Sequence, residues 1–162
     1  MKSLKASNRI GGYWEDCQKA RKEIQKMDLQ LTYTKERDFQ GRIASRSESY
    51  TFQDKFIDPS STRDSISGLY LFGSYHYPDF AIGSEGTAIE VKLADHAGKI
   101  KIAIAQSLFY RMHYRFVIMV LIDTSDDGEM YNLIMDEGSQ EAKLIKDLEE
   151  SFNIFTVIKL GR

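Results

Sequence analysis

Apolar residues recur at helical spacing in four stretches of the chain. Residues 13–31 and 34–47 show this pattern first, and residues 99–114 and 139–151 show it again further on. Apolar side chains three and four positions apart share one face of a helix, so each stretch predicts an amphipathic helix that packs on a core. Residues 1–12 lack the pattern and predict a loose N-terminal tail.

Other stretches alternate apolar with polar residues or form short apolar runs, which is typical of strands. Strands are predicted over residues 50–56, 69–75, 79–83, 87–93, 116–123 and 154–160. Helices and strands then follow one another in the order α-α-β-β-β-β-α-β-α-β. This order predicts an α/β fold in which helices flank a mixed β-sheet on both sides.

The bulk composition fits one globular domain over residues 1–162. The chain is 42% hydrophobic and 28% charged, with a formal net charge of −2. No apolar run is long enough to span a membrane and no apolar signal segment follows the basic N-terminus, so we expect a cytoplasmic protein without a membrane partner. Cys17 is the only cysteine, which excludes an intramolecular disulfide and a four-cysteine metal site.

The two predicted strands 79–83 and 87–93 form a hairpin with one charged and one apolar face. Side chains alternate between the faces of a strand. A connecting loop with an even number of residues therefore places Asp79, Glu90 and Lys92 on one face, with Asp79 across from Lys92. An odd number would separate them unless a bulge restored the alternation. The other face is predicted to pack on the core and consists of Phe80, Ile82, Ile89, Val91 and Leu93.

Asp79 and Glu90 are the candidate metal ligands of the charged face. Two converging carboxylates repel each other and raise each other's pKa, and a hard divalent cation relieves that repulsion. Mg²⁺ prefers oxygen ligands and keeps several of its waters, and Mn²⁺ is the alternative. A metal ion there would polarise a phosphodiester and acidify a water, while Lys92 would orient that water or stabilise developing negative charge.

The spacing of these residues resembles the signature of the PD-(D/E)xK nuclease superfamily. Pro78 and Asp79 are followed, after ten residues, by Glu90, Val91 and Lys92. The resemblance covers a core region from residue 36 to residue 123. It implies a restriction-endonuclease-like fold and Mg²⁺-dependent hydrolysis of DNA.

Further residues extend this resemblance beyond the hairpin. Gln106 and Tyr110 resemble the QxxxY motif of the RecB-like branch, and their spacing places them on one face of the predicted helix, where they would support the site. The family also tends to place a Glu on the helix before the sheet, for which Glu36 is the candidate metal ligand and Glu23 the alternative. A solvated polar flank and an ordinary first-turn acid are the competing structural interpretations.

Lys99 and Lys101 are candidate substrate-binding residues, because they lie near the start of a predicted helix, where anions bind favourably. The expected partner is DNA, together with a second copy of the chain or another protein that supplies specificity. Two other functions stay open. One is a catalytically silent nuclease fold that binds DNA or serves assembly, and the other is a dimeric junction resolvase.

Overall fold

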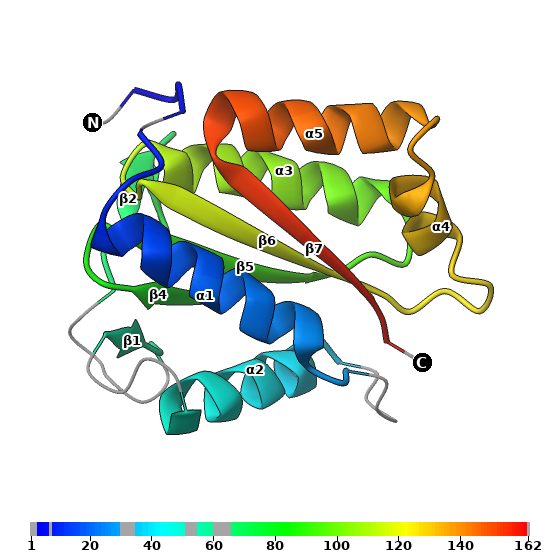
Figure 1. The fold of residues 1–162 in the computed structure, drawn as a ribbon, viewed down its shortest axis with the longest axis horizontal. Helices are drawn as coiled ribbons and strands as arrows, with labels where there is room; N and C mark the ends of the chain where they lie inside the picture. Colours follow the sequence, from blue (N-terminus) through cyan, green and yellow to red (C-terminus); the bar gives the residue numbers. More distant parts are fainter. Residues whose placement is uncertain (1–2, 7, 30–34, 51–54, 60–65, 162) are drawn as a thin grey trace.

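A mixed β-sheet lies between two layers of helices (Figure 1). The structure, a computed structural model, describes residues 3–6, 8–29, 35–50, 55–59 and 66–161. Within this part of the chain the main sheet has five strands in the order β1-β4-β5-β6-β7. Their bounds are Phe56–Ile57 (β1), Phe80–Ile82 (β4), Thr87–Leu93 (β5), Phe116–Asp123 (β6) and Ile154–Leu160 (β7). The β1–β4 and β4–β5 pairs are antiparallel, and the β5–β6 and β6–β7 pairs are parallel.

The helices cover both faces of this sheet, and each face carries apolar side chains that they bury. Helices α1 (Gly12–Lys26) and α2 (Glu36–Tyr50) pack on one face, and α3 (Ala97–Arg111) and α5 (Gln140–Phe152) pack on the other (Figure 1). All eight residues of β6 are buried, which is expected of a strand covered on both faces. The predicted α/β class, with a mixed sheet flanked by helices on both sides, is confirmed.

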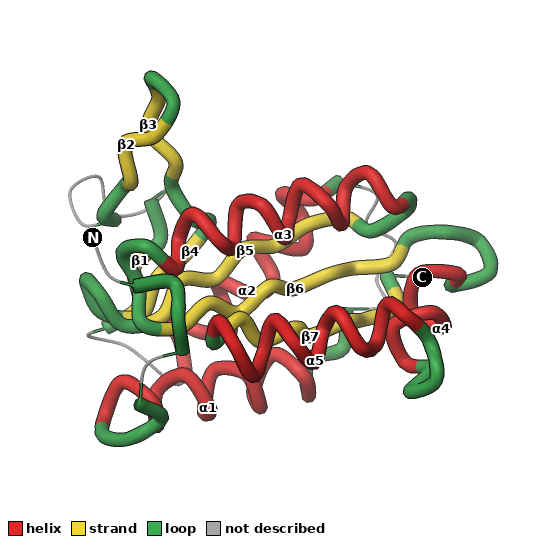
Figure 2. Tube along the Cα trace, turned by 90° about the horizontal axis from the view of Figure 1, so that it is seen from above, coloured by secondary structure: helices red, strands yellow, loops and turns green. Residues whose placement is uncertain are grey.

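The stretch 69–75 is a separate hairpin, so the prediction of one strand there is wrong. Its strands are β2 (Leu69–Leu71) and β3 (Ser74–His76), which form a second, two-stranded sheet. Figure 2 shows this hairpin projecting away from the main sheet. The chain reverses at Phe72 and Gly73, whose φ angles are 50° and 81°. Pattern analysis missed this turn because Phe is not a usual residue at a positive φ.

Other differences lie at the ends of elements. The first helix ends at Lys26 because Met27 is extended, with φ −62° and ψ 134°, so its predicted end at residue 31 is wrong. The second helix continues to Tyr50, and of the predicted strand 50–56 only Phe56 pairs in β1, together with Ile57. Residues 51–54 lie outside the described part. Helix α4 (Glu129–Met135) was not predicted, since its seven residues make about two turns, too short a segment for a helical period to be recognised. In the described part of the chain, no helix is both long enough and apolar enough to cross a membrane.

Candidate active site

The β4–β5 hairpin carries the charged face, in a register that differs from the predicted one. Ile82 pairs with Thr87, so the loop contains four residues, an even number. Ala81 pairs with Ala88, and the same register continued by one pair places Asp79 opposite Glu90. The predicted pairing of Asp79 with Lys92 is therefore wrong by two residues, although the even loop keeps the predicted faces. The wrong register came from assuming a two-residue loop.

Asp79 lies directly before β4, and its side chain accepts a hydrogen bond that a strand residue would otherwise accept. Its Oδ2 accepts a hydrogen bond from the backbone N–H of Val91 at 2.7 Å. Strand β4 starts only at Phe80, so this N–H on β5 needs another acceptor. Pro78, directly before, has no N–H to donate and cannot extend the strand pairing. The Pro-Asp sequence thus limits β4 at its N-terminal end and fixes the carboxylate against β5.

Glu90 and Lys92 are the buried and half-buried charges of the site. Glu90 is only 2% exposed. The Lys92 Nζ lies 3.2 Å from Glu90 Oε1 and 3.3 Å from Glu36 Oε1. The other oxygen of Glu90, Oε2, is buried and accepts no hydrogen bond of ordinary geometry from the described residues, although the Tyr110 hydroxyl lies near enough to lower the pKa of this carboxyl. Because an unpaired buried oxygen is costly, Glu90 offers a ligand atom that the surrounding protein does not satisfy.

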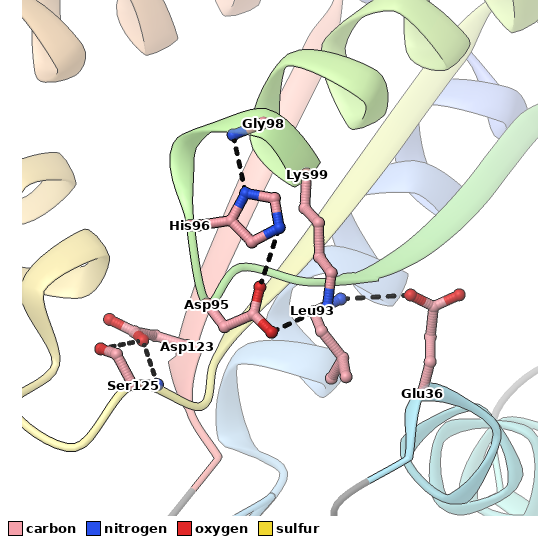
Figure 3. A network of polar contacts seen from close by, with 8 residues as sticks. All are labelled: Glu36, Leu93, Asp95, His96, Gly98, Lys99, Asp123 and Ser125. Atoms are coloured by element: carbon pink, nitrogen blue, oxygen red, sulfur yellow. Dashed lines mark hydrogen bonds and ion pairs between the residues drawn. The ribbon is translucent and has the colours of Figure 1, made fainter.

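Glu36 reaches the site from α2, which lies on the opposite face of the sheet from α3. Besides its contact with Lys92, its Oε2 accepts from the backbone N–H of Leu93 at 3.3 Å (Figure 3). Glu23, the alternative candidate, lies on α1 and pairs with Lys26 at 3.8 Å. The structure thus brings Glu36 to Lys92 at the end of β5, and it places Glu23 in a surface ion pair.

Electrostatics set the two hairpin carboxyls apart from ordinary surface acids. Burial, followed by the negative charge of Asp79, raises the pKa of Glu90 to about 7, although Lys92 opposes the rise. Burial also raises the pKa of Asp79, against the effects of the Val91 N–H and of Lys92. Burial alone would lower the pKa of Lys92, but the carboxylates of Glu90 and Glu36 outweigh it and raise that pKa. Lys92 therefore remains a cation at neutral pH.

Tyr110 of α3 connects the helix to the hairpin. Its hydroxyl donates a hydrogen bond to the Tyr77 carbonyl at 2.8 Å, one residue before Pro78. Burial, together with the charges of Glu90 and Asp79, raises the pKa of Tyr110 well above its ordinary range, so the hydroxyl stays a donor. Gln106 lies one turn earlier on α3, and its side chain hydrogen-bonds to Tyr110 and lowers the pKa of that hydroxyl. The Oε1 atom of Gln106 is buried and has no hydrogen-bond partner among the described residues.

A groove of about 480 Å³ opens beside Asp79. Helix α2 forms one wall, and the segments before β4 and after β1 form the rest. The residues that line it are Arg37, Gln40, Gly41, Ala44, Asp58, Pro59, Tyr77, Pro78, Asp79 and Phe80. Gln40 was missed by the sequence analysis, although it follows Glu36 by one helical turn. Its side chain hydrogen-bonds to Asp79 and lowers the pKa of that carboxyl.

The two predicted substrate lysines lie at the start of α3. Lys99 pairs with Asp95 at 2.8 Å, and the His96 Nδ1 caps the helix by accepting from the Gly98 N–H (Figure 3). Lys101 is exposed. No contact recorded among the described residues joins either lysine to Asp79 or Glu90, so their substrate-binding role stays a prediction.

The described residues contain no group of three or more His, Cys, Asp or Glu side chains arranged to hold a metal ion. Asp79 and Glu90 are therefore a pair of carboxylates, and Glu36 is bound by Lys92 and the Leu93 N–H. A pair suffices for Mg²⁺, which often takes one or two protein carboxylates and fills its remaining positions with water. The unsatisfied oxygen of Glu90 fits such an ion.

In comparisons with known protein families, with curated proteins and with solved structures, the chain has no match. The chain is thus assigned to a class by its fold, which is α/β with a mixed sheet. None of these comparisons bears on the resemblance to PD-(D/E)xK nucleases, which stays an expectation from the motif residues.

Proposed function

We propose that this chain is a metal-dependent nuclease that hydrolyses phosphodiester bonds of DNA. The observation that supports this most strongly is the buried Glu90 carboxylate, which has one unsatisfied oxygen, a second carboxylate across the hairpin and a lysine at 3.2 Å. Such a group lowers folding stability, since burying charge costs more than ordinary pairing returns. A plain surface salt bridge would need neither the burial nor the unsatisfied oxygen.

Asp79 and Glu90 would hold the divalent cation, Mg²⁺ or Mn²⁺. When bound, the ion would supply Lewis acidity toward a phosphodiester and would acidify a coordinated water. Asp79 is oriented by the Val91 N–H and Glu90 by the Lys92 ammonium. These fixed partners keep both carboxylates in place before a substrate arrives. For Glu36, a place in the metal shell remains a prediction.

Lys92, Tyr110 and Arg37 have separate roles in this proposal. Lys92 is kept charged by its two carboxylates, and it would orient the attacking water or stabilise charge developing on the phosphate. Tyr110 is a positioning residue, because its hydroxyl holds the Tyr77 carbonyl and so fixes the segment that carries Asp79. Arg37 lines the groove and would contact the phosphate backbone of DNA.

Cleavage of plasmid and of linear DNA in Mg²⁺ or Mn²⁺ tests this proposal. We expect Asp79→Ala and Lys92→Ala to lower the rate about a hundredfold or more, as is typical of groups that act on the reacting atoms. Lys146→Ala removes an exposed lysine of α5 and should cleave like the wild type. Equal cleavage by all variants would refute the site. DNA binding without cleavage by any of them would instead favour the silent nuclease fold.

The oligomeric state distinguishes the remaining alternative, a dimeric junction resolvase, from a nuclease that acts as a monomer. A junction resolvase needs two sites in one symmetric assembly. Sedimentation of the chain with and without branched DNA should reveal a dimer if this alternative is correct, and a monomer that cleaves would exclude it.

A further inference from the structure

The β2–β3 hairpin exposes aromatic side chains beside the candidate active site. Tyr70, Tyr75 and Tyr77 are between 50% and 62% exposed, and Phe72 at the tip is 88% exposed. Exposed aromatic groups of this kind are uncommon on a surface without a partner. The hairpin projects from the main sheet, as Figure 2 shows, and part of it contacts Phe109 of α3.

Three of these rings form a row that leads to the groove at Asp79. The ring centroids of Tyr70 and Tyr75 lie 5.0 Å apart in an edge-to-face arrangement at 62°. Those of Tyr75 and Tyr77 lie 5.9 Å apart with an interplanar angle of 22°. Tyr77 lines the groove together with Asp79, and its carbonyl accepts the Tyr110 hydroxyl. The row is thus anchored at the end where the proposed chemistry takes place.

Phe72, at the tip of the hairpin, is an unfavourable residue for the turn that it occupies. Phe72 and Gly73 form a two-residue turn with both φ angles positive, and Asn-Gly is the pair that such a turn favours. A Phe there adopts a disfavoured backbone conformation while its ring stays in solvent. The ring approaches Phe109 of α3 at 5.9 Å, but this contact leaves most of it uncovered. Neither local conformation nor burial therefore explains Phe72.

The charge of the hairpin indicates what kind of contact it makes. Residues 66–78 contain no Asp, Glu, Lys or Arg, so they offer aromatic faces and no ion pairs to phosphate. Aromatic side chains bind single-stranded nucleic acid by stacking on successive bases, with little regard to sequence. In a duplex the base faces are already stacked on one another, so such a surface needs unpaired bases.

From these features we propose that the β2–β3 hairpin is a stacking arm for unpaired bases next to the scissile phosphodiester. This inference rests on the proposed nuclease function and narrows its substrate to DNA with a single-stranded segment. The position of the row favours a nucleic-acid strand over a protein, because a strand that stacks on Tyr70 and Tyr75 would continue past Tyr77 into the Asp79 groove. Phe72 would stack on the base farthest from the site.

Binding measured in EDTA tests the arm without any cleavage. The probes are a fluorescein-labelled single-stranded oligodeoxynucleotide and a duplex of the same length. We expect Tyr75→Ala to weaken single-strand binding about tenfold while duplex binding stays unchanged, and Tyr75→Trp to retain it, since stacking on one ring carries energy of this size. The matched control is Leu144→Ala, which removes an exposed apolar side chain of α5.

Phe72→Asn separates binding from folding stability. This change installs the Asn-Gly pair that the turn favours, so thermal stability should rise or stay level, while single-strand binding weakens. Unchanged single-strand binding by Tyr75→Ala and Phe72→Asn would overturn the arm. Variants that alter self-association with no effect on DNA binding would also overturn it and would indicate a protein contact. The binding assay contains no metal and measures no cleavage. Its result therefore tests the arm even if the chain proves not to be a nuclease.

Discussion

Glu90 links the chemistry of the site to the stability of the fold. Its carboxyl pKa is raised from 4.5 to about 7, first by burial and then by the charge of Asp79. The folded state therefore binds a proton more readily than the unfolded chain does, so this group makes the free energy of unfolding fall as pH rises from 4.5 toward about 7. Above that range its contribution is level.

Glu90→Gln should remove most of this pH dependence. We expect the variant to be more stable than the wild type at about pH 8, by on the order of 3 kcal/mol at most, and to differ little at about pH 4. Urea unfolding at both pH values in EDTA measures the effect. If the two proteins lose stability in parallel as pH rises, other groups cause the loss.

Metal removal gives a second test at the same residue. An ion that binds only the folded chain adds RT ln(1 + [L]/Kd) to its stability, about 2.7 kcal/mol at a hundred times Kd. We expect Mn²⁺ to raise the Tm of the wild type, EDTA to reverse the rise, and Glu90→Gln to abolish it. Glu150→Gln, at an exposed ion pair of α5, should keep the rise. An equal rise in all three proteins would place the ion elsewhere.

At the scale of elements, the β4–β5 loop decides which residues face each other. A Cβ at Gly86 would lie 2.4 Å from the Ile82 carbonyl oxygen and 2.8 Å from the Tyr13 ring. Backbone and ring cannot both withdraw, so this close approach requires glycine. The observed path of the four-residue loop past Ile82 and Tyr13 therefore has no room for a larger residue at position 86.

Gly86→Ala should therefore destabilise the chain by about 1–3 kcal/mol, the usual cost of overpacking a tight site. Gly41→Ala on α2 is the matched control, because a Cβ there meets nothing within 4 Å. Alanine is the better helix former by about 1 kcal/mol, so Gly41→Ala should stabilise. Urea unfolding measures the free energy of unfolding of both variants, which should fall for Gly86→Ala and rise for Gly41→Ala. An unchanged free energy of unfolding in Gly86→Ala would show that the loop can rearrange.

The elements that were predictable from the sequence are those with strong burial patterns. Strands β5, β6 and β7 occupy the predicted residues, because strands that helices cover consist of apolar runs that are visible in the sequence. The β4–β5 register was not predictable, because alternation fixes the face of a residue but not its partner. The contact of Glu36 with Lys92 joins residues 56 positions apart, and only the packing of α2 against the sheet brings them together.

At the scale of the whole molecule, the site gathers residues from both helical layers. Glu36 comes from α2 on one face, Tyr110 from α3 on the other, and Lys92 from the strand between them. Under the proposed function, Glu36 would act either as a metal ligand or as a partner that positions Lys92. Its side chain is 32% exposed, so its pairing contributes little to folding, on the order of 1 kcal/mol or less.

Glu36→Gln is therefore expected to change catalysis more than stability. The amide oxygen can still accept from the Leu93 N–H, but the negative charge beside Lys92 is lost. We expect the cleavage rate to fall about tenfold or more while the Tm shifts by only a few degrees. Glu23→Gln is the control, since Glu23 pairs with Lys26 on α1 and should cleave normally. Full cleavage activity in Glu36→Gln would confine the catalytic groups to the β4–β5 hairpin. Loss of cleavage activity in Glu23→Gln alone would show that Glu23, and not Glu36, belongs to the site.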